Sequence, residues 1–271
     1  MPKSNLFTNP DAVLAYDVAL AAGGRLLDRP EILELDAKST PTDIVTHMDK
    51  AAEALIVERL VQARPHDGLL GEEGAARTGE SGRTWVIDPI DGTINYMYQL
   101  PFWAVSLGLV DDDNRGIVGV VHAPGLGKTW VGVRGEGAIV VQNSQTHTLQ
   151  VSEQQQLGHA LMGTGFGYSS ERRTSQARVL NSVLPQVRDI RRLGSCAIDL
   201  CLVAEGIIDG YYERGVHHWD HAAGSLIAQE AGAVVCGLRG NREGNDMLVA
   251  ANPHIYQSLV SILEAANADT D

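Results

Sequence analysis

The chain has 271 residues, 44% of them hydrophobic, so it can bury a large core and lacks the composition of a disordered protein. Its net charge of −13 makes nucleic acid an unlikely partner, because nucleic-acid-binding surfaces are usually basic. Three sparse cysteines argue against a disulfide framework, the first residues lack a signal-peptide pattern, and no apolar run reaches membrane-spanning length. We therefore expect a protein of the cytoplasm with no membrane partner.

The N-terminal half begins with two predicted amphipathic helices. Residues 9–29 and 48–65 carry apolar side chains at helical spacing. The segments that follow are short, rich in β-branched or aromatic residues, and separated by Gly, Pro or Asp, which predicts strands. These predicted strands are 84–90, 102–110, 116–123, 128–134 and 137–142. They suggest an antiparallel type of sheet, and the polar stretch 142–150 is the best candidate for a boundary between two lobes.

The C-terminal half alternates predicted strands and helices. The strands are 159–166, 207–214, 233–237 and 247–251, and the helices are 174–187, 195–206, 220–232 and 253–267. Gly206 and Gly232 are suited to end two of these helices. We therefore expect an N-terminal α+β lobe over 1–145 and a C-terminal α/β lobe over 146–271, joined as one compact unit of stacked α and β layers.

The stretch "DPIDGT" at 88–93 is the first candidate site. Asp88 is expected at the end of a strand, and Asp91 follows with Pro89 between them. Two carboxylates this close repel each other unless they share a divalent cation. Gly92 and Thr93 then offer backbone N–H groups to a phosphate at the start of a possible short helix. The alternative is an Asp-rich turn that only caps a helix.

Three further segments place charged residues near predicted element ends. They contain Glu72 and Glu73; Asp220; and Lys38, Asp43 and Asp49. For Asp220 the alternative is an ordinary helix cap, and for residues 38–49 it is a solvated loop with a capping aspartate. Each segment alone is ambiguous.

Together the four segments resemble the inositol monophosphatase family, within the lithium-sensitive, magnesium-dependent sugar phosphatases. Asp-Pro-Ile-Asp-Gly-Thr is unbroken at 88–93, and Trp-Asp followed by a small-residue helix ending in Glu-Ala-Gly stands at 219–232. The resemblance runs from about Lys38 to the helix after Asp220. It implies a layered α-β-α-β-α sandwich, as in inositol monophosphatase and fructose-1,6-bisphosphatase, and a homodimer.

The resemblance also assigns residue roles at a site for two or three Mg²⁺ ions. The metal ligands it implies are Glu72, Asp88, the backbone oxygen of Ile90, Asp91 and Asp220. Thr93 and Asp49 match the catalytic pair that orients the attacking water, since a carboxylate behind a threonine can accept its proton. The implied substrate contacts are Gly92, Thr93, Gly194, Ser195, Cys196, Glu213 and Asp220. The implied supporting residues are Lys38, Asp43 and Glu73.

The resemblance implies a phosphomonoesterase, with inositol monophosphate as the first candidate substrate. Ile94 stands where many relatives have a second threonine, and Cys196 where alanine is usual. Both departures lie near the expected pocket rim, so histidinol phosphate, fructose 1,6-bisphosphate and a 3′-phosphonucleotide stay open as substrates. A different class also stays open, because some bacterial relatives are associated with RNA or the transcription machinery; the acidic balance disfavours that role.

Overall fold

The computed structural model describes residues 8–30, 33, 35–37 and 44–270. The helices are α1 (Pro10–Leu27), α2 (His47–Ala63), α3 (Thr93–Met97), α4 (Ser170–Val183), α5 (Cys196–Ala204), α6 (His218–Glu230) and α7 (Pro253–Ala265). The first ten strands are β1 (Leu35–Ala37), β2 (Ile44–Thr46), β3 (Gly68–Gly71), β4 (Ala76–Arg77), β5 (Arg83–Asp91), β6 (Ala104–Asp111), β7 (Gly116–Ala123), β8 (Lys128–Val133), β9 (Gly137–Gln142) and β10 (Gln145–Thr148). The others are β11 (Leu161–Thr164), β12 (Asp189–Arg191), β13 (Gly210–Glu213), β14 (Val234–Cys236) and β15 (Leu248–Ala251).

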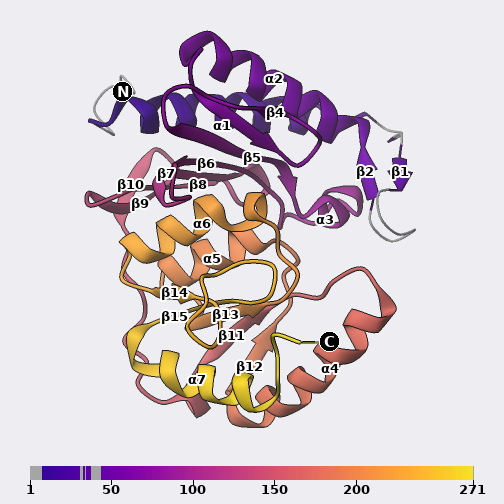
Figure 1. Ribbon diagram of the computed structural model, residues 1–271, viewed down its shortest axis with the longest axis vertical. Coiled ribbons are helices and arrows are strands. Elements are labelled where there is room, and N and C mark those ends of the chain that lie inside the picture. Colours follow the sequence, from indigo (N-terminus) through magenta and orange to yellow (C-terminus); the bar gives the residue numbers. More distant parts are fainter. Residues whose placement is uncertain (1–7, 31–32, 34, 38–43, 271) are drawn as a thin grey trace.

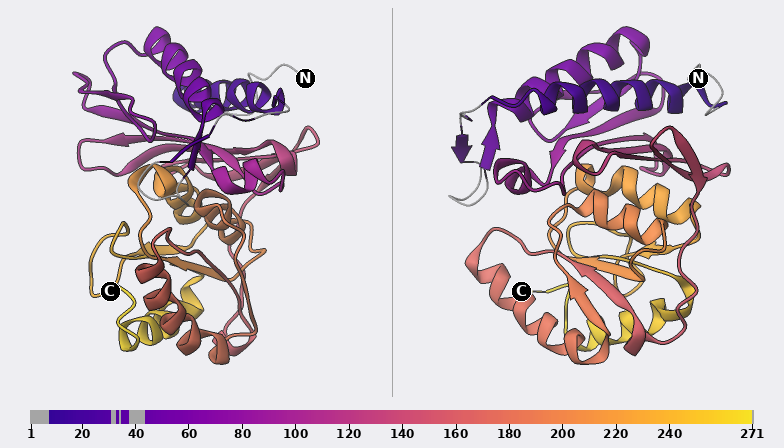
Figure 2. Two further views of the ribbon diagram at one scale, coloured as in Figure 1. Left: turned by 90° about the vertical axis from the view of Figure 1, so that its right-hand side faces the viewer. Right: turned by 180° about the vertical axis from the view of Figure 1, so that it is seen from behind.

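Five layers of secondary structure are stacked along the long axis (Figure 1). Helices α1 and α2 cover the outer face of an eight-stranded sheet, and α5 and α6 lie between this sheet and a five-stranded one. Helices α4 and α7 cover the outer face of the second sheet, as the two turned views also show (Figure 2). The predicted α-β-α-β-α sandwich is confirmed.

The large sheet has the strand order β10-β9-β8-β7-β6-β5-β3-β4, and every neighbouring pair is antiparallel except β3 and β5. Alternate residues of its central strands face opposite helical layers. Val118 and Val120 of β7 pack in the core beneath α1 and α2, while Val121 and Ala123 pack in the core with α5 and α6. The small sheet has the order β12-β11-β13-β15-β14, with parallel pairing on both sides of β11.

The structure corrects several predicted element boundaries. Segment 142–150, predicted as the lobe boundary, contains β10, which pairs with β9, so the chain stays in the large sheet as far as Thr148. All four β10 residues are exposed, and their polarity hid the strand. Strands β3, β4 and β12, each two to four residues long, were also not predicted. Helix α4 begins at Ser170 rather than at residue 174, and Ser169 caps it by accepting a hydrogen bond from the Arg172 amide at 3.2 Å.

Helix α6 lies unusually close to the large sheet. A Cβ atom added to Gly119 of β7 would come within 2.5 Å of the Ala223 carbonyl oxygen of α6, and one added to Gly108 of β6 would lie 3.1 Å from the Ala222 Cβ. Ordinary Cβ contacts begin at about 3.4 Å, so glycine at these positions permits the close packing. The layer that carries Asp220 is thereby held against the layer that carries Asp88 and Asp91.

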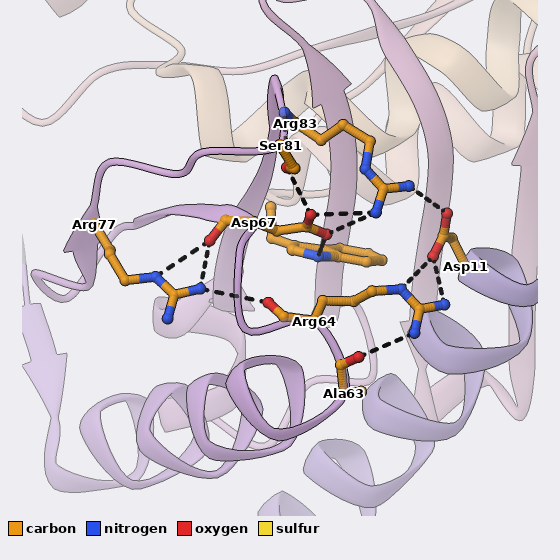
Figure 3. A network of polar contacts seen from close by, with 8 residues as sticks. Asp11, Ala63, Arg64, Asp67, Arg77, Ser81 and Arg83 are labelled. Atoms are coloured by element: carbon orange, nitrogen blue, oxygen red, sulfur yellow. Dashed lines mark hydrogen bonds and ion pairs between the residues drawn. The ribbon is translucent and has the colours of Figure 1, made fainter.

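A polar network joins α1, the end of α2 and the start of β5 (Figure 3). The buried Asp67 accepts hydrogen bonds from Arg83 at 3.2 Å, from Ser81 at 2.7 Å and from the Trp85 indole at 3.0 Å. Asp11 pairs with Arg83 at 2.8 Å and with Arg64 at 2.7 Å. The network therefore fixes both ends of the segment between α2 and β5, and this segment carries Glu72.

None of the helices in the described ranges combines the length and the apolar character needed to cross a membrane.

Candidate active site

A β-bulge in β5 brings Asp88 and Asp91 to one face of the large sheet. Asp88 pairs with Ser106 of β6, and Asp91 pairs with Ala104, so β5 contains one extra residue between the two pairs. In a regular strand, residues three apart point to opposite faces, and one extra residue reverses that relation. The bulge includes Pro89, which has no N–H group to lose from the ladder.

The shared face is the one directed at α6. Val86, two residues before Asp88, packs against Ala222 of α6, whereas Ile87 and Ile90 both belong to the core on the α1 and α2 side. Asp88 is almost completely buried, and its Oδ1 accepts a hydrogen bond from the Ile90 amide at 3.0 Å. The sequence spacing therefore becomes a pair of carboxylates aimed at the helix that carries Asp220.

The turn after β5 holds the predicted catalytic pair. Gly92 has φ +91°, a left-handed conformation that glycine adopts without strain, and α3 starts at the next residue. The Thr93 hydroxyl lies 3.2 Å from Asp49 Oδ1 and 3.0 Å from the Ile90 carbonyl oxygen. Asp49 is fully buried in the first turn of α2, where its Oδ2 accepts from the Thr46 amide at 2.8 Å and the Thr46 hydroxyl at 2.6 Å. One Asp49 oxygen is thus fixed by the helix cap, and the other faces Thr93.

Asp91 and Asp220 are each held by hydrogen bonds from helix starts. Asp91 Oδ2 accepts from the Ser195 hydroxyl and from the Ala197 amide, both at 2.6 Å, at the N-terminus of α5. Asp220 Oδ2 accepts from the His217 amide at 2.7 Å at the N-terminus of α6. Capping is therefore part of the role of Asp220, and its second carboxylate oxygen can still serve the pocket.

A polar cavity of about 450 Å³ joins most of the predicted site residues. Those that line it are Glu72, Asp88, Ile90, Asp91, Gly92, Thr93, Gly194, Cys196, Glu213 and Asp220. Asp49 and Ser195 are buried behind this lining and act on it through Thr93 and Asp91. Lys38 and Asp43 lie outside the described residues.

The carboxylates of the cavity raise one another's pKa. Burial raises the pKa of Asp88 well above its usual value, and the charges of Glu72, Asp91 and Asp220 raise it further. Burial raises the pKa of Asp91 to about 7, although the Ser195 and Ala197 hydrogen bonds oppose the rise. The pKa of Asp220 is also raised well above its usual value, first by burial and then by the charge of Asp91. This cluster is costly to ionise unless a cation compensates its charge.

Glu213 also lines the cavity, where its charge acts on Asp91 and Asp220. It accepts a hydrogen bond from the hydroxyl of Tyr211, which is fully buried behind it in β13. Burial raises the pKa of Glu213, while the Tyr211 hydrogen bond and the charge of Arg192 oppose the rise. A buried, oriented carboxylate of this kind can accept hydrogen bonds from substrate hydroxyl groups.

Glu53 fixes the turn that carries Glu72 and Glu73. Its two carboxylate oxygens accept from the Glu73 and Ala75 amides, each at 2.9 Å. Glu73 is not part of the cavity lining, so its predicted supporting role would act through this turn. The sequence held a signal for Glu53, because it is a carboxylate on a face of α2 that also buries Ala52, Ile56 and Leu60.

The donor set fits a hard divalent cation. Carboxylate and backbone carbonyl oxygens are the ligands that Mg²⁺ and Ca²⁺ prefer, and the mutual repulsion described above would be relieved by such an ion. Among the described residues, no group of three or more His, Cys, Asp or Glu side chains is placed, as it stands, to hold a metal ion. Asp91 and Asp220 each have one oxygen tied to protein donors, so ion binding would draw on the other oxygen of each. Asp88 accepts from the Ile90 amide and also shares a hydrogen bond with Glu72.

Several cavity residues were not predicted from the sequence. Arg172, Arg192, His217 and Trp219 all line the cavity. The His217 and Trp219 rings are stacked with centroids 4.9 Å apart, next to Asp220. Arg192 lies two residues before Gly194, a predicted substrate contact, and could have been included with it, whereas nothing in the pattern of α4 distinguishes Arg172 from its neighbouring arginine.

Comparison with known proteins identifies close relatives over nearly the whole chain. The model of the inositol monophosphatase family matches residues 9–268. The inositol-1-monophosphatase of Mycobacterium leprae is 43% identical over 262 residues, covering 94% of this chain and 87% of that protein. Nus factor SuhB of Pasteurella multocida is 37% identical over 268 residues, covering 96% of this chain and 98% of that protein. The crystal structure of the extragenic suppressor protein suhB from Bartonella henselae matches with a TM-score of 0.87 and 30% identity, covering 94% of this chain and 99% of that one.

Proposed function

The chain belongs to the inositol monophosphatase family, and from this premise we propose that it is a magnesium-dependent phosphomonoesterase. Its proposed reaction is hydrolysis of inositol monophosphate to myo-inositol and phosphate. One observation carries the proposal: the Thr93 hydroxyl, backed by the buried Asp49, opens onto the same cavity as the carboxylates of Asp88, Asp91 and Asp220. A nucleophile-orienting pair and a cation-binding set meet there.

The proposed metal ligands are Glu72, Asp88, Asp91, Asp220 and the carbonyl oxygen of Ile90. When bound, Mg²⁺ ions would supply Lewis-acid stabilisation of the charge that develops on the attacking and departing oxygens. Ligands come from both sheet and helix layers, so ion binding would also tie these layers together.

Thr93 and Asp49 would prepare the water that attacks phosphorus. With its hydrogen directed at Asp49 Oδ1, the Thr93 hydroxyl turns its lone pairs to the cavity and can accept a hydrogen bond from that water. The proton can then pass from the water through Thr93 to Asp49, whose other oxygen is held by Thr46. The amides of Gly92 and Thr93 would orient the phosphoryl oxygens for in-line displacement.

The leaving alcohol would be held beside Glu213 of the cavity lining. Glu213, fixed by Tyr211, can accept hydrogen bonds from neighbouring hydroxyl groups of a polyol. Gly194 and Cys196 would form the wall beside it, with Ser195 buried behind them. This arrangement favours a polyol over an aromatic alcohol.

The deciding experiment is a phosphate-release assay with Mg²⁺ on four substrates at matched concentration. These are inositol 1-phosphate, histidinol phosphate, fructose 1,6-bisphosphate and a 3′-phosphonucleotide. Asp91→Asn and Asp220→Asn should abolish activity and keep the native circular-dichroism spectrum, because each removes a ligand charge at nearly constant volume. Asp112→Asn, at an exposed carboxylate outside the cavity, is the matched control and should remain active. Near-normal turnover by either site variant would refute the metal assignment.

The name of the Pasteurella relative favours a second candidate, a role in transcription. The net charge of −13 weighs against direct RNA binding. A gel-shift titration with structured RNA at low and physiological salt decides this point. Tight binding that persists at physiological salt would support the second role, and no binding at low salt would reject direct RNA contact.

A further inference from the structure

The parallel strands β11 and β13 separate where they reach the cavity. Their last paired residues are Thr164 and Tyr212, and the Thr164 hydroxyl donates to the Tyr212 carbonyl oxygen at 2.9 Å. The chain leaves β11 for α4 on the outer face of the sheet and leaves β13 for α6 on the inner face (Figure 1). Such a divergence opens a crevice at the carboxyl ends of the strands, where ligands bind. Residues 166–169 line the cavity on the β11 side, and Glu213 and Gly215 line it on the β13 side.

One side chain, Gln176 of α4, bridges the two diverging segments. Its side-chain carbonyl oxygen accepts a hydrogen bond from the Gly167 amide at 2.9 Å, and its NH₂ group donates to the Arg214 carbonyl oxygen at 3.2 Å. The side chain is buried and lies behind the cavity lining, of which it is not a part. Because the bridge needs an acceptor at one end and a donor at the other, a side-chain amide suits it, whereas a carboxylate or a thioether does not.

Glu213 packs against the segment that Gln176 holds. A Cβ atom added to Gly165 would overlap the Glu213 carboxylate, so this glycine leaves room for the carboxylate between the two segments. The Gly167 carbonyl oxygen is also fastened to α4, because it accepts from Arg173 at 2.7 Å. Segment 165–169 is thereby held at a fixed place relative to Glu213, the residue proposed to accept hydrogen bonds from the leaving alcohol.

We propose that Gln176 is a specificity-determining positioning residue, which sets the width of the leaving-group side of the cavity by holding Gly167 and Arg214 together. This inference rests on the proposed function, because it takes Glu213 as the residue that receives the leaving alcohol. A ring-shaped polyol bonded to Glu213 has to fit between the two segments, whereas a small acyclic alcohol does not fill the space between them. The reacting phosphate belongs to the turn of Gly92 and Thr93, on another element, so Gln176 affects which alcohol binds and not the displacement itself.

The test compares inositol 1-phosphate with glycerol 2-phosphate in the full-length protein with Mg²⁺. Gln176→Met has a similar length and forms neither hydrogen bond, whereas Gln176→Glu keeps an acceptor for the Gly167 amide and loses the NH₂ donor. The matched control is Gln186→Met, at an exposed glutamine outside the cavity.

Gln176→Met should raise KM for inositol 1-phosphate about tenfold and change kcat less than about threefold, since the loss of two hydrogen bonds that act on substrate binding has that scale. Gln176→Glu should raise the same KM by a smaller factor. In both variants, KM for glycerol 2-phosphate and the inhibition constant of inorganic phosphate should change less than about threefold, and the control should change none of these values.

An equal rise in KM for both substrates, or weaker inhibition by inorganic phosphate, would overturn the proposal, because Gln176 would then serve the reacting phosphate or the fold. An unchanged KM for inositol 1-phosphate in Gln176→Met would overturn it as well, and if that variant does not fold, Gln176→Glu decides by the same criteria. If the wild type hydrolyses no phosphate monoester, the proposed function fails, and calorimetry with Ca²⁺ and the same two compounds decides the inference. Tighter binding of inositol 1-phosphate that is lost in Gln176→Met would support the inference, whereas no such preference in the wild type, or one that persists in the variant, would reject it.

Discussion

Acidification should destabilise the fold through one buried histidine, His122 of β7. Its side chain is buried against Gly23 of α1, and its Nδ1 lies 2.9 Å from the Thr129 hydroxyl. Burial lowers the pKa of His122 to about 4, from an ordinary value of 6.5. The unfolded chain therefore binds a proton at pH values where the native ring stays neutral. The contribution of His122 to the stability of the native state is complete above pH 6.5, and it is lost as the pH falls towards 4.

The size of the effect follows from the two pKa values. With 1.36 kcal/mol per pKa unit, the full difference of 2.5 units corresponds to about 3 kcal/mol, and about 2.5 kcal/mol of it should be lost between pH 7.5 and 4.5. The assay is urea unfolding in EDTA at four pH values for the wild type and for His122→Gln, which keeps a polar side chain and cannot titrate. EDTA removes metal as a variable, and the other carboxylates titrate alike in both proteins.

The free energy of unfolding should fall with acidification more steeply in the wild type than in His122→Gln. The difference between the two slopes, and not either slope alone, gives the contribution of His122 to the pH dependence of the free energy of unfolding. If the difference in unfolding free energy between the two proteins is the same at pH 7.5 and pH 4.5, His122 is protonated in the native state and the reasoning is refuted.

Four further predictions concern the site and its support. Thr93→Ala and Asp49→Asn should each lower kcat by roughly two to four powers of ten, and the double variant should be little worse, because the two act as one unit; multiplied losses in steady-state assays would show independent roles. Asp67→Asn should lower the free energy of unfolding by about 2 kcal/mol in urea titrations, since it removes the buried charge that accepts from Arg83, Ser81 and the Trp85 indole and leaves Arg83 with Asp11 alone, and a loss below about 0.5 kcal/mol would contradict that. Mg²⁺ should raise the melting temperature more at pH 8 than at pH 5, because protons compete for the carboxylates, Asp91 with a pKa of about 7 among them; an equal rise at both pH values would argue against carboxylate ligation. Li⁺ should inhibit at millimolar levels and Ca²⁺ should not replace Mg²⁺, whereas full activity in saturating Li⁺ would indicate a different site.

Local patterns in the sequence predicted stacked α and β layers and the paired carboxylates at 88–93, whereas the five-layer sandwich and most of the other site residues were implied by the resemblance to the family. Apolar periodicity defined most helices and strands, and the 88–93 stretch contained its carboxylates in one short run. The sequence could not show to which face of the sheet each carboxylate points. Asp88 and Asp91 share a face only through a bulge, which depends on pairing with β6, a strand that follows after the turn.

The remaining omissions have a similar physical origin. β10 is held by pairing with β9 and not by its own burial, so its polar residues resemble a linker. Arg172 and Arg173 are adjacent on α4, and only the fold separates the one that enters the cavity from the one that bonds to Gly167. Long-range geometry, and not residue type, decided both cases.

The close packing of α6 on the large sheet has a consequence for ion size. Asp220 belongs to the helix and Asp88 to the sheet, so the gap between these proposed ligands follows the spacing of the two layers. A methyl group at Gly119 would have to move the helix by about 1 Å, from 2.5 Å to an ordinary contact with Ala223. Oxygen ligands lie about 2.0–2.1 Å from Mg²⁺ and about 2.3–2.6 Å from Ca²⁺, a smaller difference than that shift. Gly108 and Gly119, neither of which lines the cavity, would then help to match the site to a small cation by keeping the helix close to the sheet.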